Sequence, residues 1–154
     1  MWGRWARFRA LRIDEKRLLA VALIWLPIVQ VGLRLLGYQR MRQLLSRLGT
    51  NMSALPEANR QPDAMTIEVA QRVGRIVNIA AGRRALHATC LARSLLTWWF
   101  LHRRGVAGTM VFGVPVSGGS FAAHAWVEVA GMVVNDAPDV RDRFGELEAA
   151  NLPG

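Results

Sequence analysis

Three residues of types that can act together in nucleophilic catalysis occur in the second half of the chain. Cys90, the single cysteine among 154 residues, opens an apolar stretch with the pattern of a helix. A helix N-terminus favours the thiolate, which is the reactive form of cysteine. His124 lies between two alanines in an alternating stretch that is typical of a strand. The alternative interpretations are a buried structural cysteine and a strand histidine with no chemical role.

Asp136 becomes a partner for His124 if the intervening hairpin has one particular loop. With a three-residue loop, Val129-Ala130-Gly131, residue 124 faces residue 136 with Cβ atoms about 5 Å apart. An aspartate there would orient the imidazole and stabilise its cationic form. A two-residue loop would shift the register by one and turn Asp136 to the opposite face of the sheet. The pairing therefore depends on the type of turn.

A metal site is the weaker interpretation of the same residues. His87-x-x-Cys90 has the spacing of two metal ligands, but a zinc site needs three or four, and only His102 and His124 remain as imidazoles. The sequence also lacks the glycine patterns of phosphate-binding loops and the serine motif of hydrolases. We therefore expect no metal and no cofactor.

The composition indicates one globular domain, alone or with an appendage. Hydrophobic residues make up 52% of the chain, which is too apolar for disorder, and one cysteine excludes disulfide scaffolds and cysteine-rich zinc fingers. The net charge of +9 is uneven: residues 1–47 hold ten basic and two acidic residues, whereas residues 138–154 hold two and four. A basic front region can attract anionic lipid or an acidic protein surface, and no nucleic-acid motif accompanies it.

The apolar segment Leu18–Val29 raises the question of a membrane. Its twelve uncharged residues fall short of the about 20 that a spanning helix needs. Asp14 and Glu15 precede it and no cleavage site follows, which argues against a signal peptide. A buried core helix, a helix lying on a membrane surface and a true span stay open. We expect a cytoplasmic protein with peripheral membrane contact through residues 1–36.

The elements that must position these residues are helices first and a sheet second. Hydrophobic periodicity predicts helices over Leu18–Leu36, with a kink at Pro27, and over Tyr38–Leu48, Pro62–Ala81 and Thr89–Arg104. Strand formers and turn residues predict an antiparallel sheet from Thr109–Val116, Phe121–Val129 and Met132–Asp136, with a turn at Ser117–Ser120.

This order of elements predicts an α+β fold in which the helix carrying Cys90 packs on the sheet. The polar stretch Thr50–Gln61 reads as a connector. We accordingly divide the chain into a basic and apolar helical region, residues 1–61, and a core, residues 62–154. The run Trp98-Trp99-Phe100 is expected to pack inside the helical layer.

Several motifs together resemble the B2 proteins of lasso peptide biosynthesis. These are Thr89-Cys90-Leu91-Ala92-Arg93-Ser94, then Val111-Phe112-Gly113-Val114, Ala123-His124-Ala125-Trp126-Val127-Glu128, and Val134-Asn135-Asp136. The similarity is strong from Cys90 to Asp136, and the order cysteine, histidine, aspartate suits the family. B2 proteins are leader peptidases with a transglutaminase-like, papain-related cysteine protease core.

The resemblance implies a role for each of the three residues. Cys90 would be the nucleophile, His124 the general base and acid, and Asp136 the residue that orients the imidazole. The reaction would be hydrolysis of the bond between leader and core of a precursor peptide, without a cofactor. The implied partners are the leader region of that precursor, a stand-alone B1 recognition protein, because 154 residues leave no room for a fused one, and the lasso cyclase.

Two other functions stay open. A thioester on Cys90 can be resolved by an amine instead of water, which would make the protein a transglutaminase-like acyl transferase. The chain could also be a non-catalytic scaffold that binds a leader peptide or a membrane through its basic, tryptophan-rich front region.

Overall fold

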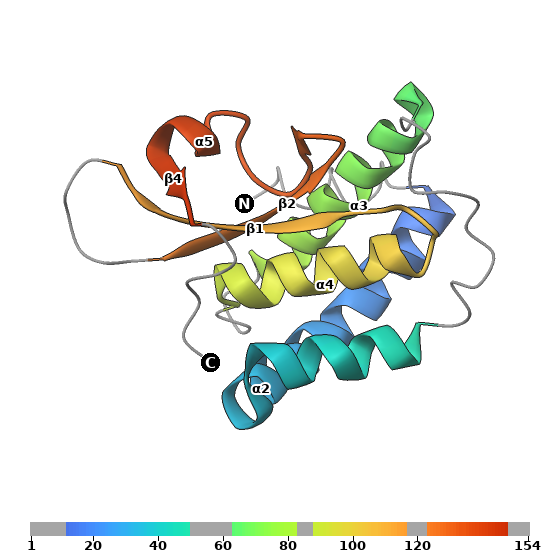
Figure 1. Ribbon diagram of the computed structural model, residues 1–154. Helices are drawn as coiled ribbons and strands as arrows, with labels where there is room; N and C mark the ends of the chain where they lie inside the picture. Colours follow the sequence, from blue (N-terminus) through green and yellow to red (C-terminus); the bar gives the residue numbers. More distant parts are fainter. Residues whose placement is uncertain (1–11, 50–62, 83–87, 117–122, 148–154) are drawn as a thin grey trace, which may run out of the picture.

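The computed structural model describes residues 12–49, 63–82, 88–116 and 123–147. Its elements, in chain order, are α2 (Ile13–Leu48), α3 (Ala64–Ala81), α4 (Cys90–His102), β1 (Thr109–Pro115), β2 (His124–Val129), β3 (Met132–Val133), α5 (Val140–Arg143) and β4 (Phe144–Glu146). The three long helices precede the sheet, so the predicted α+β class is confirmed (Figure 1).

α2 consists of two helical halves that meet at Gly37. This glycine has φ 75° and ψ 172°, a conformation that side chains disfavour. The break separates the two helices predicted from the sequence, whereas Pro27 lies inside the first half. Figure 1 shows the first half in blue and the second in cyan. Gly32 faces Met41 across the break, and a Cβ there would collide with the methionine.

α3 and α4 begin at polar residues that cap their first turns. Asp63 accepts hydrogen bonds from the backbone N–H and the hydroxyl of Thr66, at 2.9 and 2.6 Å. These bonds lower the pKa of the Asp63 carboxyl. Thr89 caps α4 in the same way. Both helices lie where the periodicity predicts them, although α4 ends at His102 rather than at Arg104.

The sheet is antiparallel with the strand order β3-β2-β1-β4. Alternate residues of β2 enter two different cores, as the pleat requires. Val127 and Val129 join the main core with α2, α3 and α4, whereas Trp126 joins a smaller core with Val111 and Val140. The main core also contains the run Trp98-Trp99-Phe100, which confirms its predicted packing role.

The last described part of the chain contains two elements that were not predicted from the sequence. α5 follows Asp136, and β4 then pairs with β1 so that Phe144 lies opposite Pro115. In addition, the predicted strand over residues 132–136 ends at Val133. Short elements of three or four residues leave too little periodicity to detect.

Several predictions concern residues outside the described ranges. These are the front segment 1–11, the connector 50–61, the turn 117–120, residues 121–122 of the second strand, and His87 of the metal alternative. The division of the chain between residues 61 and 62 stays a prediction.

An ion pair ties α5 to the outer face of β2. Glu128 is 7% exposed and accepts hydrogen bonds from the Trp126 indole N–H (2.7 Å) and from Nε and Nη2 of Arg141 (2.8 Å for Nε). Burial alone would raise the pKa of Glu128, but the hydrogen bonds and the charge of Arg141 lower it overall. A folded-state pKa below the unfolded value means that the ionised carboxylate stabilises the fold.

We expect Arg141→Met to lower the melting temperature by a few degrees at pH 7, because it leaves the buried carboxylate without its cation. The stabilisation by Glu128 is present above its ordinary pKa of about 4.3 and is lost as the pH falls through the lower folded-state value. The gap between the melting temperatures of the parent and the variant should therefore narrow as the pH falls from 7 to 3.

Thermal unfolding followed by circular dichroism at both pH values tests this. Glu68→Gln, which removes one partner of an exposed ion pair with Arg72, serves as the control and should change little at pH 7. An equal gap between parent and Arg141→Met at pH 7 and pH 3 would contradict the assignment.

Candidate active site

Cys90 is the first residue of α4, and the start of this helix is held from two sides. The Thr89 hydroxyl oxygen accepts a hydrogen bond from the Ala92 amide at 3.2 Å. Thr89 also donates its backbone N–H to Oε1 of Gln30 in α2, at 3.1 Å. The partly exposed thiol therefore lies at the positive end of the helix dipole, as the sequence predicted.

Ser94 lies one helical turn after Cys90 and aligns α4 with β2. Its hydroxyl donates to the carbonyl oxygen of Ala125 at 2.8 Å, and Cys90 Sγ lies 3.9 Å from the carbonyl oxygen of Ala123. Four helical residues rise about 6 Å and two strand residues about 6.6 Å, so both contacts fit one alignment. The thiol consequently lies beside the residue that precedes His124.

The imidazole of His124 packs against two aromatic rings. Its centroid is 4.6 Å from that of Phe144 and 6.1 Å from that of Trp126, with interplanar angles of 26° and 29°. Gly113 pairs with His124 across the ladder, and a Cβ at Gly113 would come within 2.9 Å of both the Trp126 ring and Phe144 Cβ. The missing side chain at Gly113 thus leaves room for the two rings.

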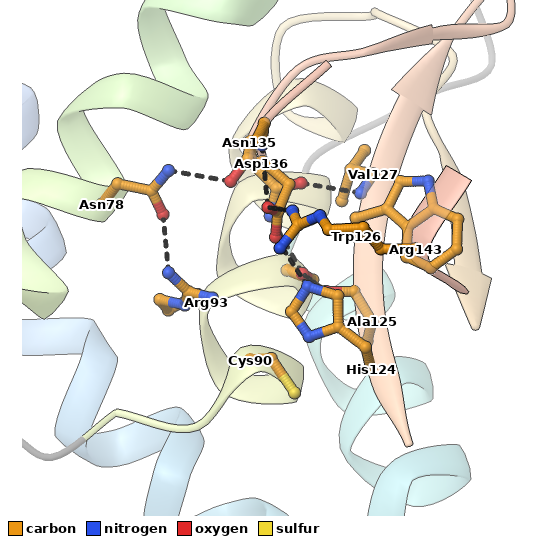
Figure 2. A network of polar contacts seen from close by, with 12 residues as sticks. Asn78, Cys90, Arg93, His124, Ala125, Trp126, Val127, Asn135, Asp136 and Arg143 are labelled. Atoms are coloured by element: carbon orange, nitrogen blue, oxygen red, sulfur yellow. Dashed lines mark hydrogen bonds and ion pairs between the residues drawn. The ribbon is translucent and has the colours of Figure 1, made fainter. Parts of the chain in front are cut away.

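Asp136 contacts the imidazole directly. Its Oδ2 lies 2.7 Å from Nε2 of His124, and the two side chains are only 14% and 18% exposed. Oδ1 accepts the Ala137 amide at 2.8 Å and lies 3.8 Å from the guanidinium of Arg143. In Figure 2, Nε2 faces Asp136 and the other ring nitrogen, Nδ1, is turned toward the side where Cys90 lies.

The hairpin register differs from the one that a three-residue loop would give. The turn has two residues, Ala130-Gly131, with φ 50° and 76°. If this register continued, residue 136 would lie opposite Ala125 with its side chain on the face away from His124. The contact with His124 exists because the ladder ends at Val133 and the chain then leaves the sheet.

Asn135 holds the chain where it leaves the sheet, and it is only 3% exposed. Its Oδ1 accepts the Val127 amide at 2.7 Å, and its Nδ2 donates to Ser94 Oγ at 2.9 Å. The backbone carbonyl oxygen of Asn135 accepts a hydrogen bond from Nδ2 of Asn78 at 2.8 Å. Oδ1 of Asn78 in turn lies 3.4 Å from Nη1 of Arg93. Figure 2 shows how β2, α3 and α4 converge on this segment.

Sequence reasoning named Cys90, His124 and Asp136 but gave no role to Ser94, Asn135 or Phe144. A signal existed for Ser94, because a hydroxyl among apolar residues of a core helix needs a buried partner. Asn135 precedes Asp136 directly, but the expected ladder would have paired it as an ordinary strand residue. Phe144 carried no signal, since no element was predicted where it lies.

Comparisons with known proteins agree with this architecture. Residues 29–149 match the model of the transglutaminase-like superfamily. A 58-residue stretch, 38% of this chain, is 41% identical to the microcin J25-processing protein McjB of Escherichia coli. That alignment covers 27% of the McjB sequence, about a quarter of its length. No solved structure matches the chain significantly.

Both matches support the resemblance to the B2 proteins of lasso peptide biosynthesis. The family model extends from the middle of α2 to just beyond β4 and so includes every residue named in the candidate site. The chain belongs to the transglutaminase-like superfamily.

Proposed function

We propose that this protein is a leader peptidase of lasso peptide biosynthesis that hydrolyses the bond between the leader and the core of a precursor peptide. The observation that carries the proposal is the 2.7 Å contact between His124 Nε2 and Asp136 Oδ2, at the end of the helix–strand pair that also carries Cys90. A nucleophile, a base and a residue that orients the base are the parts that covalent peptide hydrolysis needs.

In the first half of the reaction, Asp136 accepts the Nε2 proton of His124 in a hydrogen bond, so the lone pair of Nδ1 is available to the thiol. Nδ1 takes the proton of Cys90, and the sulfur attacks the carbonyl carbon of the scissile peptide bond. The tetrahedral intermediate then collapses, and the imidazolium gives its proton to the departing amine of the core peptide. The leader stays bound to Cys90 as a thioester.

In the second half, water replaces the amine on the same side of the thioester. His124 takes a proton from the water, the hydroxide attacks the thioester carbon, and the carbon–sulfur bond breaks. The imidazolium returns its proton to the departing sulfur, which restores the thiol of Cys90 and the neutral imidazole. The leader leaves as a carboxylic acid that loses its own proton to water.

Charge on the intermediate is stabilised by the start of α4. The first backbone amides of a helix have no acceptor within the helix, and the Ala92 amide is taken by the Thr89 side chain. We propose the backbone amides of Cys90 and Leu91 as donors to the developing oxyanion, because they belong to this first turn and adjoin the attacking sulfur.

The similarity to McjB supports a processing role of this kind, since that relative is a microcin J25-processing protein. We propose the leader region of a precursor peptide as the substrate, a stand-alone B1 recognition protein as the partner that presents it, and the lasso cyclase as the enzyme that uses the released amine. We also propose a cytoplasmic location, because the precursor is made by ribosomes there.

Cys90→Ala and His124→Ala should each abolish leader release, because each removes a group that forms or breaks a bond. Asp136→Asn should retain a fraction of the activity, because an amide can still contact the imidazole but cannot stabilise its cation. The measurement is mass spectrometry of a purified precursor incubated with each variant and the B1 protein.

Asp139→Asn is the matched control for Asp136→Asn, because Asp139 is also an ion-pair partner of Arg143 (3.3 Å) but is 60% exposed. It should retain the parental rate. Complete cleavage by Cys90→Ala, with unchanged folding by circular dichroism, would rule out the assignment of the nucleophile.

The reactivity of the Cys90 thiol and the mass of the product distinguish a peptidase from an acyl transferase and from a non-catalytic scaffold. We expect iodoacetamide to label Cys90 faster in the parent than in His124→Ala, since the imidazole promotes the thiolate. Hydrolysis adds one water to the leader fragment, whereas acyl transfer would add the mass of an amine acceptor. Equal labelling of both proteins would favour the scaffold, and an amine adduct would favour the transferase.

The exposed side of α2 supports a membrane contact. Five apolar residues at alternating three- and four-residue spacings form what we term the α2 stripe: Val21, Ile24, Ile28, Val31 and Leu35, which are 37% to 78% exposed. By length and composition the helix could also cross a membrane, and 28% of its most apolar window is buried. Exposed basic residues flank the stripe, namely Lys16, Arg17 and Arg34.

We propose that the α2 stripe lies on an anionic lipid surface, with the basic residues at its ends near the headgroups. A second copy of this chain would bring like charges together, which disfavours a dimer through this face. The protein should therefore sediment with vesicles that contain phosphatidylglycerol and not with pure phosphatidylcholine, and added salt should weaken binding.

The double variant Ile24→Gln, Leu35→Gln should lose this binding, whereas Met65→Gln, which changes a residue of α3 that is 72% exposed, should not. Binding of the double variant equal to that of the parent, or no binding of the parent at all, would contradict a lipid-binding role for the α2 stripe.

A further inference from the structure

Asp136 reaches His124 only because the chain leaves the sheet between residues 133 and 136. In the observed register, Val127 and Val134 would normally exchange two backbone hydrogen bonds. One of them is present, from the Val134 amide to the Val127 carbonyl oxygen at 3.0 Å. The other is replaced, because the Val127 amide donates to the side-chain Oδ1 of Asn135 at 2.7 Å.

The carbonyl group of Val134, freed from the ladder, turns toward α3. It approaches Gly74 so closely that a Cβ on that glycine would overlap the carbonyl oxygen. The backbone can therefore bend away from the sheet at this point. Without the bend, residue 136 would lie opposite Ala125 and its carboxylate would face away from the imidazole.

The bend is held by the side chain of Asn135 and not by backbone pairing. Oδ1 of Asn135 accepts a hydrogen bond from the Val127 amide in β2, and Nδ2 of Asn135 donates one to Ser94 in α4 at 2.9 Å. Ser94 is fully buried and donates its own proton to the Ala125 carbonyl oxygen. An aspartate at position 135 could not donate to Ser94 and would bury a charge, so the amide is the side chain that satisfies both neighbours.

We infer that Asn135 is the positioning residue of the site: it acts through Asp136 and contacts none of the reacting atoms. Together with Ser94 it links the helix of Cys90, the strand of His124 and the segment of Asp136 in one buried hydrogen-bonded chain. This inference rests on the proposed function for its kinetic consequence, but its structural consequence can be measured without any substrate.

The structural test is the proton on His124 Nε2, observed by NMR of protein labelled with nitrogen-15 histidine. The chain has three histidines, so the signals can be assigned by single substitutions. A proton held between an imidazole and a buried carboxylate exchanges slowly and resonates downfield of the amides. It should be seen in the parent, and it should disappear in Asp136→Asn and in Asn135→Leu.

The kinetic test compares the same proteins on the precursor peptide. Asn135→Leu should lower kcat about 100-fold with little change in KM, since misplacement of a catalytic group by about 1 Å has effects of this size. Ser94→Ala, which leaves the Val127–Asn135 bond in place, should lower kcat by a smaller factor.

Thr97→Val is the matched control for loss of a buried hydroxyl on the same helix. Thr97 is fully buried and donates at 2.9 Å to the carbonyl oxygen of Arg93, within α4 rather than to the sheet. Its variant should keep both the Nε2 signal and kcat, even if its melting temperature falls as far as that of Ser94→Ala.

The results separate this inference from the proposed function. An Nε2 signal and a kcat that are unchanged in Asn135→Leu would overturn the inference and leave the peptidase intact. Loss of the signal in that variant, in a protein that cleaves no precursor, would support the inference and reject the peptidase. If Asn135→Leu does not fold, the same readings on Ser94→Ala decide.

Discussion

The hydrogen bond from Ser94 to the Ala125 carbonyl oxygen holds a helix and a strand in one alignment, and the candidate site depends on that alignment. The apolar contacts between α4 and β2 are non-directional and by themselves define this alignment only loosely. A buried hydroxyl has far fewer acceptable positions than a methyl group, since each unpaired polar atom costs free energy. The Ser94 hydroxyl therefore defines the alignment of α4 on β2 within an otherwise apolar interface.

The environment of the imidazole is built from both faces of the sheet. Aromatic rings from β2 and β4 pack against it, and the Glu128–Arg141 pair on the outer face anchors the indole of Trp126. Polar contacts on the inner face come from α3 and α4. This arrangement keeps the imidazole and its carboxylate mostly away from water, where a hydrogen bond between them is strongest.

Much of the fold and the three candidate residues could be predicted from the sequence, because their signals are local. Helix periodicity, the capping residues Asp63 and Thr89, and the glycine at the break of α2 each depend on a few neighbouring residues. Two features could not be predicted. The hairpin register depends on whether two or three residues form the turn, and Ala130 gives no warning that it adopts a positive φ.

The second unpredictable feature is the way in which Asp136 reaches His124. The expected contact was right for the wrong reason: the three-residue loop that would have produced it does not exist, and the bend at Asn135 produces it instead. That bend needs Gly74 from α3 and Ser94 from α4, which lie about 60 and 40 residues earlier in the chain. Contacts of such long range leave no pattern within a short window of sequence.

The position of Phe144 in β4 determines when the surroundings of the His124 imidazole can form during synthesis of the chain. A polypeptide is synthesised from its N-terminus, so the sulfur and the imidazole are made before the aromatic ring of Phe144 that packs against the imidazole. β4 can join the sheet only after synthesis has passed residue 146. The imidazole of a nascent chain therefore lacks the aromatic ring of Phe144 until β4 has been synthesised.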